Sequence, residues 1–94
     1  MDKVDRKRDR LEIIYDILKI VQDNHNSIKP TPLLRYSNLS SQSFNEYIKD
    51  LEQRELILFV KDKKSRKYVT LTTKGFEYLD KYSMIKGFIQ EFEL

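Results

Sequence analysis

The stretch SNLSSQSFNEYIKDLEQRELILFVKDKKSRKYVTLTTKG, residues 37–75, decides the fold. Residues 38–40 are helix breakers, after which Ser40 or Ser41 can cap a helix that runs to about residue 54. Phe44, Ile48 and Leu51 recur at helical spacing and predict the buried stripe of that helix.

The second half of the same stretch predicts a β-hairpin. An apolar run at residues 56–60 and an alternating run at residues 67–71 enclose a polar turn at residues 62–65. The turn lacks the Asn-Gly or Asp-Gly pair of the tightest hairpins, so we expect a loop of at least about four residues.

Two further helices are expected before this stretch. Residues 8–24 carry apolar side chains on two helical stripes, which predicts a helix covered on more than one side. Residues 28–29 have room only for a very short strand. Thr31 can cap a short second helix over about residues 32–37, with Pro32 in its first position. The second helix and the helix that follows the turn at residues 38–40 are together a helix-turn-helix candidate, although corners between helices are common.

A final helix is expected after the hairpin, with Thr72 or Thr73 as its cap. Gly75 lowers helix propensity in the first turn, so its presence predicts close packing there. The chain is therefore α+β but mostly α, with a three-helix core, a β-hairpin wing and a C-terminal helix. This is the element order of a winged helix-turn-helix.

Composition limits the class of protein. A chain of 94 residues allows one domain, and 39% hydrophobic with 12% aromatic residues is enough for a small core. The absence of cysteine excludes a disulfide framework, a thiolate zinc site and a cysteine nucleophile. Neither a membrane-spanning run nor a signal peptide is evident, so we expect a cytoplasmic protein with no membrane partner.

The positive charge is concentrated in one segment. The net charge is +3, yet residues 56–75 alone carry six basic side chains against one acidic one. A compact basic cluster favours a polyanion partner, and a solvated, charged turn is the alternative. The six are Lys61, Lys63, Lys64, Arg66, Lys67 and Lys74.

Several short patterns, taken in order, resemble a known family. They are Leu11–Leu18, Asn38-Leu39-Ser40, Tyr47-Ile48-x-x-Leu51, Glu55-Leu56-Ile57 and Leu71-Thr72-x-Lys74-Gly75. Over about residues 8–82 the chain resembles the small archaeal winged helix-turn-helix DNA-binding proteins, which are predicted transcriptional regulators. The resemblance implies a recognition helix at residues 41–54 and a wing at residues 61–67. It also implies a homodimer, since several members pair through an extended C-terminal helix as an antiparallel coiled coil.

The candidate DNA contacts follow from this arrangement. On a recognition helix, the amides of Gln42 and Asn45 suit adenine edges, and Lys49 suits guanine or a phosphate. The wing would act by charge on the backbone or in a narrow minor groove. An ordinary polar helix face and a solvated loop are the alternatives, and an N-terminal arm of Arg6, Lys7, Arg8 and Arg10 is a weaker candidate. The predicted DNA-binding residues are Lys29, Arg35, Ser41, Gln42, Ser43, Asn45, Lys49, Lys61, Lys63, Lys64, Arg66 and Lys67.

The last helix carries a candidate dimer interface. Ile85, Phe88, Ile89 and Phe92 are large, and a domain of this size has little spare core to cover them. An exposed apolar stripe marks an interface, and two such helices would form an isologous homodimer. The alternative is a helix that folds back on the first helix.

No catalytic, cofactor or metal site is evident in the sequence. His25 stands alone in a polar loop, and no glycine-rich phosphate loop is present. No small-molecule effector is evident either. We therefore expect not an enzyme but a sequence-specific regulator that binds double-stranded DNA at the nucleoid. Residues 1–75 would form its DNA-binding part and residues 76–94 its dimerisation helix. A protein-protein interaction module and a sequence-tolerant architectural DNA-binding protein are the alternatives.

Overall fold

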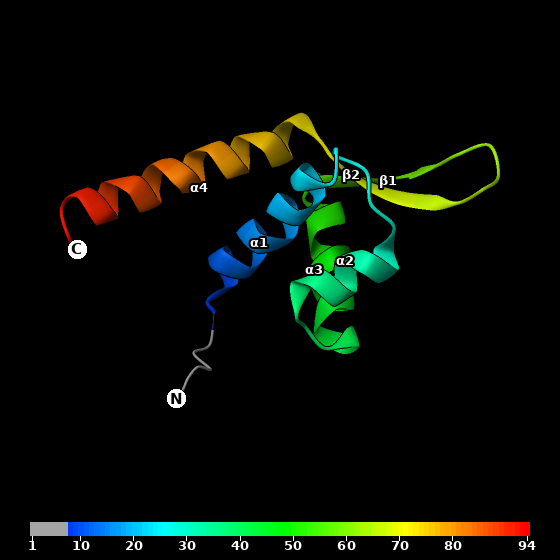
Figure 1. The fold of residues 1–94 in the computed structure, drawn as a ribbon, viewed down its shortest axis with the longest axis horizontal. Coiled ribbons are helices and arrows are strands. Elements are labelled where there is room, and N and C mark those ends of the chain that lie inside the picture. Colours follow the sequence, from blue (N-terminus) through cyan, green and yellow to red (C-terminus); the bar gives the residue numbers. More distant parts are fainter. Residues whose placement is uncertain (1–7) are drawn as a thin grey trace.

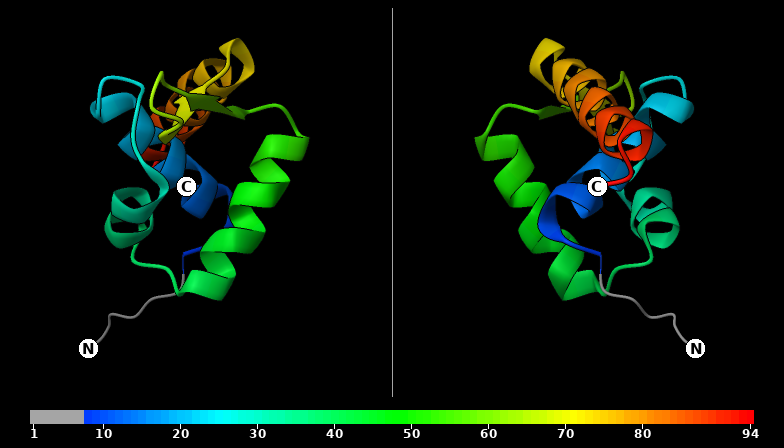
Figure 2. Two further views of the ribbon diagram at one scale, coloured as in Figure 1. Left: turned by 90° about the vertical axis from the view of Figure 1, so that its right-hand side faces the viewer. Right: turned by 90° about the vertical axis from the view of Figure 1, so that its left-hand side faces the viewer.

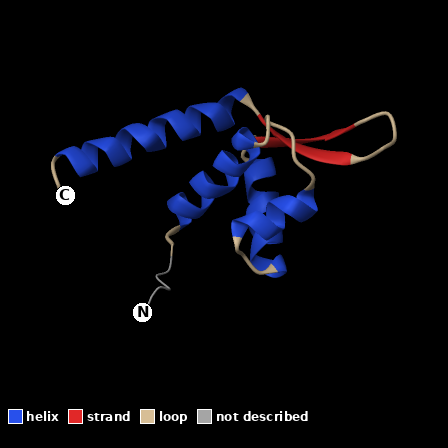
Figure 3. Ribbon diagram, viewed as in Figure 1, coloured by secondary structure: helices blue, strands red, loops and turns tan. Residues whose placement is uncertain are grey.

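The structure, a computed structural model, describes residues 8–94, which form four helices and a two-stranded antiparallel sheet. In chain order these are α1 (Arg10–Asp23), α2 (Pro30–Ser37), α3 (Ser41–Gln53), β1 (Ile57–Lys61), β2 (Lys67–Leu71) and α4 (Thr73–Glu91). Helices α1 to α3 form the body, from which the hairpin and α4 extend in opposite directions (Figures 1 and 3). The predicted mostly helical α+β class, with its core, hairpin and C-terminal helix, is confirmed.

The core lies where the three helices of the body meet the inner face of the hairpin. Helix α1 buries residues from both of its predicted stripes, and Phe44, Ile48 and Leu51 of α3 are buried as predicted. Figure 2 looks along the length of the molecule and shows α3 on the far side of the body from α2. The fully buried side chains with no exposed area are Ile17, Leu18, Val21, Leu33, Leu51, Ile57 and Val69.

The helix ends follow the predicted signals with one exception. Asn38 ends α2 in the left-handed region at φ 60°, and the Ser40 hydroxyl caps α3 by accepting from the Ser43 N–H at 3.1 Å. The prediction that Thr31 caps α2 is wrong. The helix begins earlier, at Pro30, because a proline at the first position gives up only an N–H that has no helical partner.

The hairpin is anchored to the body at its base. Strands β1 and β2 pair with Phe59 opposite Val69, and the loop between them covers residues 62–66. The very short strand expected at residues 28–29 is a single bridge, in which the Val69 N–H donates to the Ile28 carbonyl at 2.7 Å. The Leu71 N–H also donates to the Asn26 side-chain oxygen at 2.7 Å. The base of β2 is therefore fixed by the α1–α2 loop.

The first turn of α4 is joined to the segment that leaves α3. Three consecutive carbonyls, at residues 54–56, accept hydrogen bonds from it. Lys74 Nζ donates to the Arg54 carbonyl at 3.0 Å. The Thr72 hydroxyl donates to the Glu55 carbonyl at 2.6 Å, and the Thr72 N–H donates to the Leu56 carbonyl at 3.2 Å. The close packing predicted at Gly75 is confirmed, because a Cβ there would lie 2.3 Å from the Leu56 carbonyl oxygen. We call this contact the α3–α4 joint.

Candidate nucleic-acid interface

Helix α3 presents a polar face opposite its buried stripe. Ser41, Gln42, Asn45 and Lys49 are exposed, and Ser43 is half-buried near the capped end of the helix. Ser41, Asn45 and Lys49 are spaced by four residues, and Gln42 lies three before Asn45, so the four side chains share one face of the helix. The structure therefore brings together the predicted base-reading residues on one accessible surface.

The negative charge of Asp50 on the same helix is neutralised. Its carboxylate accepts from Arg54 Nε at 3.0 and 3.1 Å and forms an ion pair with Arg10 from the start of α1. The Arg10 guanidinium also lies 5.7 Å from the ring centroid of Tyr47. Asp50 therefore opposes a polyanion less than its sequence position suggests, and it ties α3 to α1.

The hairpin loop has a defined conformation built around Asp62. Its carboxylate accepts from the backbone N–H groups of Lys64 and Arg66, each at 2.9 Å, and from Arg66 Nε at 2.7 Å. The backbone hydrogen bond from Arg66 is the main cause that holds the pKa of Asp62 below its ordinary value. Asp62 thus orders the loop while offsetting part of its positive charge.

Two lysines face each other where the strands meet this loop. Lys61 and Lys67 are paired across the ladder, so both point to the face that carries Phe59. Lys67 Nζ lies 4.5 Å from the Phe59 ring centroid. Like charges directly opposite one another destabilise a hairpin. With exposed Lys63, Lys64 and Arg66 on the loop, this end of the hairpin is the basic surface predicted as the wing.

The two remaining predicted contacts flank α2. Lys29 is exposed directly before the helix, and Arg35 is exposed in its last turn. They therefore occupy opposite ends of α2 rather than one cluster.

The prediction of an N-terminal arm is wrong for Arg8 and Arg10, the two of its four residues that lie within residues 8–94. Arg8 donates to the Asp16 carboxylate at 2.7 Å and to the Ser37 carbonyl at 2.9 Å, and Arg10 is paired with Asp50. Both guanidinium groups are therefore paired with carboxylates of the same domain, which compete with a phosphate for them. Arg6 and Lys7 lie outside the described residues.

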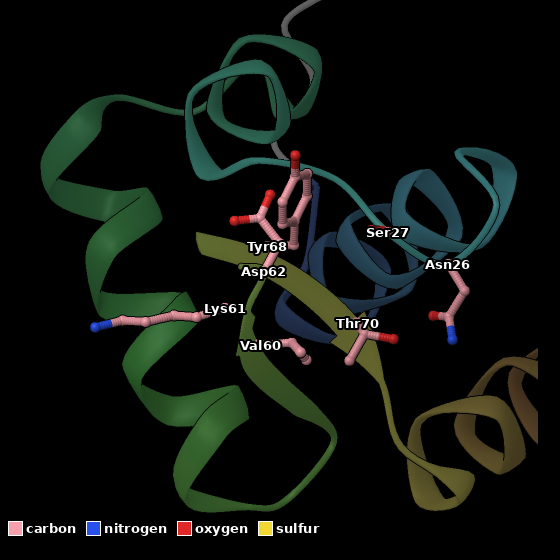
Figure 4. A pocket seen from close by; sticks show the side chains of 7 residues that line it. All are labelled: Asn26, Ser27, Val60, Lys61, Asp62, Tyr68 and Thr70. Atoms are coloured by element: carbon pink, nitrogen blue, oxygen red, sulfur yellow. The ribbon is translucent and has the colours of Figure 1, made fainter. Parts of the chain in front are cut away.

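A pocket of about 490 Å³ lies on the other side of the hairpin, against the α1–α2 loop (Figure 4). Val60, Tyr68 and Thr70 line it from the strands, and Asn26 and Ser27 line it from the loop. In Figure 4 the Lys61 side chain points away from Asn26 and Thr70. Lys61 and Asp62 also line the pocket, so it adjoins the basic surface at the loop end of the hairpin.

Two other kinds of site were sought over the part of the chain that the structure covers. Within residues 8–94, no three histidine or acidic side chains gather closely enough to hold a metal ion. Over the same range, no helix has the length and hydrophobicity needed to cross a membrane.

The three-helix body, the α2–α3 corner and the basic hairpin define a winged helix-turn-helix. The family model described as winged helix-turn-helix matches residues 7–90, so the chain belongs to that family. The resemblance noted from the sequence is thereby confirmed. No curated protein is similar enough in sequence to count as a relative.

Solved structures have the same fold. MepR, a transcription regulator of the Staphylococcus aureus multidrug efflux pump MepA, matches with a TM-score of 0.74 and 16% identity over 84% of this chain. The match spans only 59% of the MepR chain. F93 from STIV, a winged-helix DNA-binding protein, matches with a TM-score of 0.71 and 19% identity, covering 84% of this chain and 90% of F93. Sso10a-2, a DNA-binding protein from Sulfolobus solfataricus, matches with a TM-score of 0.67 and 21% identity, covering 92% of this chain and 83% of its own. At these identities the likeness concerns the fold.

Proposed function

We propose that this protein binds double-stranded DNA as a small transcriptional regulator. The observation that carries the proposal is the pairing of Lys61 with Lys67 beside a loop bearing three further exposed cations. Their mutual repulsion falls when phosphates lie between them, and each neutralised phosphate also releases a counterion. The DNA-binding proteins among the structural neighbours support the same function.

The recognition helix would read bases while the wing holds the backbone or enters the minor groove. Gln42, Asn45 and Lys49 are exposed on α3, where the amides can pair with adenine and the lysine with guanine. Ser41 and Ser43 would bond phosphate oxygens at the same end of the helix. Lys29 and Arg35 would hold the backbone on either side of α2. This division assigns specificity to α3 and most of the affinity to the wing.

The protein would act as a homodimer through α4. Ile85, Phe88, Ile89 and Phe92 are 40–57% exposed, so this half of the helix leaves much of its apolar surface uncovered by its own subunit. An exposed apolar stripe of this size is typical of an interface. Two copies would present their recognition helices to half-sites about 34 Å apart, or a multiple of that. Residues 76–94 would then be the dimerisation part, and residues 1–75 the DNA-binding part, of a cytoplasmic, non-enzymatic protein.

Salt-dependent binding tests this proposal. The anisotropy of a labelled random duplex is titrated with the protein at about 50, 100 and 200 mM salt. Three to five phosphate contacts per subunit predict a log-log slope of roughly −3 to −5 per subunit. Changing Lys63 and Lys64 to alanine should reduce the slope by about 1 to 2. The matched control removes two charges away from the wing, at half-buried Lys19 and exposed Lys86.

Two outcomes would count against it. Absence of binding at the lowest salt would exclude both DNA functions and favour a protein-binding module. Equal slopes for the wing and control variants would remove the wing from the mechanism. Site selection followed by Asn45→Ala separates a regulator from an architectural protein, because only a regulator loses discrimination between its preferred site and random duplex.

A further inference from the structure

The side of the hairpin turned away from the core carries apolar and aromatic side chains. They belong to two cross-strand pairs, Leu58 with Thr70 and Val60 with Tyr68. Cross-strand partners and alternate residues of a strand share one side of a sheet, so these four side chains lie together. We call them the outer face of the hairpin. Leu58 is 51% exposed and Val60 47% exposed, and neither takes part in the duplex contacts proposed above.

The pocket in Figure 4 opens on this outer face, and its opposite wall is the α1–α2 loop. That wall is held in place. The Asn26 side-chain oxygen accepts from the Leu71 N–H at 2.7 Å, which fixes the orientation of the amide and leaves its NH₂ group for a ligand. The hydroxyls of Ser27 and Thr70 lie in the same lining. The pocket therefore combines a tyrosine ring with hydrogen-bonding groups on a fixed frame.

This combination suits a nucleobase. A base can stack on an aromatic side chain whatever its sequence, because every base has a π-face. Amide and hydroxyl groups beside the ring can bond to the edge of an unpaired base. The volume of about 490 Å³ is within the usual range for a site that holds a small organic group. In this arrangement Tyr68 supplies the platform and Asn26 supplies the donor for the edge.

The charge around the pocket favours a strand over a free nucleotide. The exposed cations Lys63, Lys64 and Arg66 follow directly after Lys61 and Asp62, which line the loop end of the pocket. The Asp62 carboxylate is occupied by two backbone N–H groups of the loop and by Arg66. A mononucleotide brings one phosphate group, whereas a strand presents one at every nucleotide. Several cations in succession therefore match a strand.

We propose that the outer face of the hairpin binds single-stranded DNA. One unpaired base would stack on Tyr68 in the pocket, with its edge at Asn26, and the adjoining phosphates would lie on the hairpin loop. This function goes beyond duplex binding, since it uses the side of the hairpin opposite Phe59 and needs no contact from α3. It would let the protein hold a strand that has separated from its duplex.

The binding of a labelled thymidine oligonucleotide of about 12 residues, followed by anisotropy at about 50 mM salt, tests this function. Tyr68→Ala should weaken binding at least about fivefold, because the ring supplies the stack. Tyr68→Phe keeps the ring and should stay within about twofold of the wild type. Duplex affinity is measured on the same samples and should change less than about twofold in both variants.

A second variant keeps the test valid if Tyr68→Ala disturbs the hairpin. Val60 is about half exposed, so Val60→Glu places a carboxylate in the pocket without opening the core. It should weaken oligonucleotide binding at least about fivefold, because the carboxylate repels the phosphates. Gln90→Glu adds the same charge at an exposed position of α4 and should leave this binding unchanged.

Photocross-linking locates the bound base. An oligonucleotide carrying iodouracil should attach to the aromatic residue on which the base stacks, and peptide mass spectrometry should identify Tyr68. Attachment only at other residues, or no oligonucleotide binding at the salt concentration used, would overturn the proposal. Equal losses of oligonucleotide and duplex binding in Tyr68→Ala would mean one shared surface, which also contradicts it. Thymidine monophosphate that binds as tightly as the oligonucleotide would make the pocket a site for free nucleotides and overturn the assignment to a strand.

Discussion

Replacing Gly75 by alanine should destabilise the protein, although the same change in an ordinary helix stabilises it. The new Cβ would lie 2.3 Å from the Leu56 carbonyl oxygen and 3.4 Å from the Leu71 Cβ. The carbonyl belongs to the backbone at the α3–α4 joint, so it cannot turn aside like a flexible side chain. Helix α4 must therefore move away from the segment that leaves α3.

Two opposing contributions decide the magnitude. Overpacking of this kind costs about 1–3 kcal/mol, and removing a helical glycine contributes up to about 1 kcal/mol of stability. We expect a net loss of about 1–2 kcal/mol. For a domain of this size each kcal/mol corresponds to roughly 4–8 °C in the midpoint of thermal unfolding.

The chain supplies its own control. A Cβ at Gly87 meets no atom within 4 Å, so Gly87→Ala should stabilise by up to about 1 kcal/mol through helix propensity alone. Both variants are unfolded by heat and by urea at one protein concentration, since self-association shifts the midpoint. The reasoning is refuted if Gly75→Ala is as stable as the wild type or shifts in the same direction as Gly87→Ala.

Three further outcomes are expected. Glu55 ends α3 in the left-handed region at φ 63°, so Glu55→Gly should raise the free energy of unfolding in urea by about 0.5–1 kcal/mol, whereas Glu52→Gly inside the helix should lower it. Burial raises the pKa of Tyr78 to about 12, so its neutral form stabilises the fold fully below pH 10 and progressively less as pH rises towards 12. Tyr78→Phe should lower the free energy of unfolding by about 1 kcal/mol at neutral pH, and urea denaturation should show that this free energy falls less steeply with pH than in the wild type. Hydrogen bonds hold the pKa of Asp62 below 3.8, so the hairpin loop should stay ordered above that pH and lose its order as pH falls below it, which carboxyl titration by NMR would measure. At neutral pH, Asp62→Asn removes the ion pair to Arg66 and should strengthen binding of random duplex at low salt.

Local signals predicted most of the fold. Ser40, Asn38 and Thr72 act where short-range capping and turn rules place them, and Phe44, Ile48 and Leu51 are buried because helical periodicity identifies a core face. Such features depend on neighbours within one or two turns, which a single sequence displays directly.

Long-range pairings were not predictable in the same way. The ion pair between Arg10 and Asp50 joins residues 40 positions apart, and the hydrogen bond from Tyr78 to Leu11 joins residues 67 apart. Nothing local distinguishes a structural arginine from one free to bind a phosphate, which explains the error over Arg8 and Arg10. The apolar hollow between α1 and α4 was not predicted for the same reason, since only the packing of α4 on α1 brings Leu11 next to Tyr78 and Tyr82.

The α3–α4 joint has a mechanical consequence. Residues 54–56 follow α3 directly and accept hydrogen bonds from Thr72 and Lys74, so rotation about this connection breaks several contacts at once. We therefore expect α3, the base of the hairpin and the start of α4 to move as one unit. If α3 contacts DNA as proposed, a change in the direction of α4 would reorient α3 with it, so a regulatory signal would act on the orientation of this whole unit rather than on a bend within it.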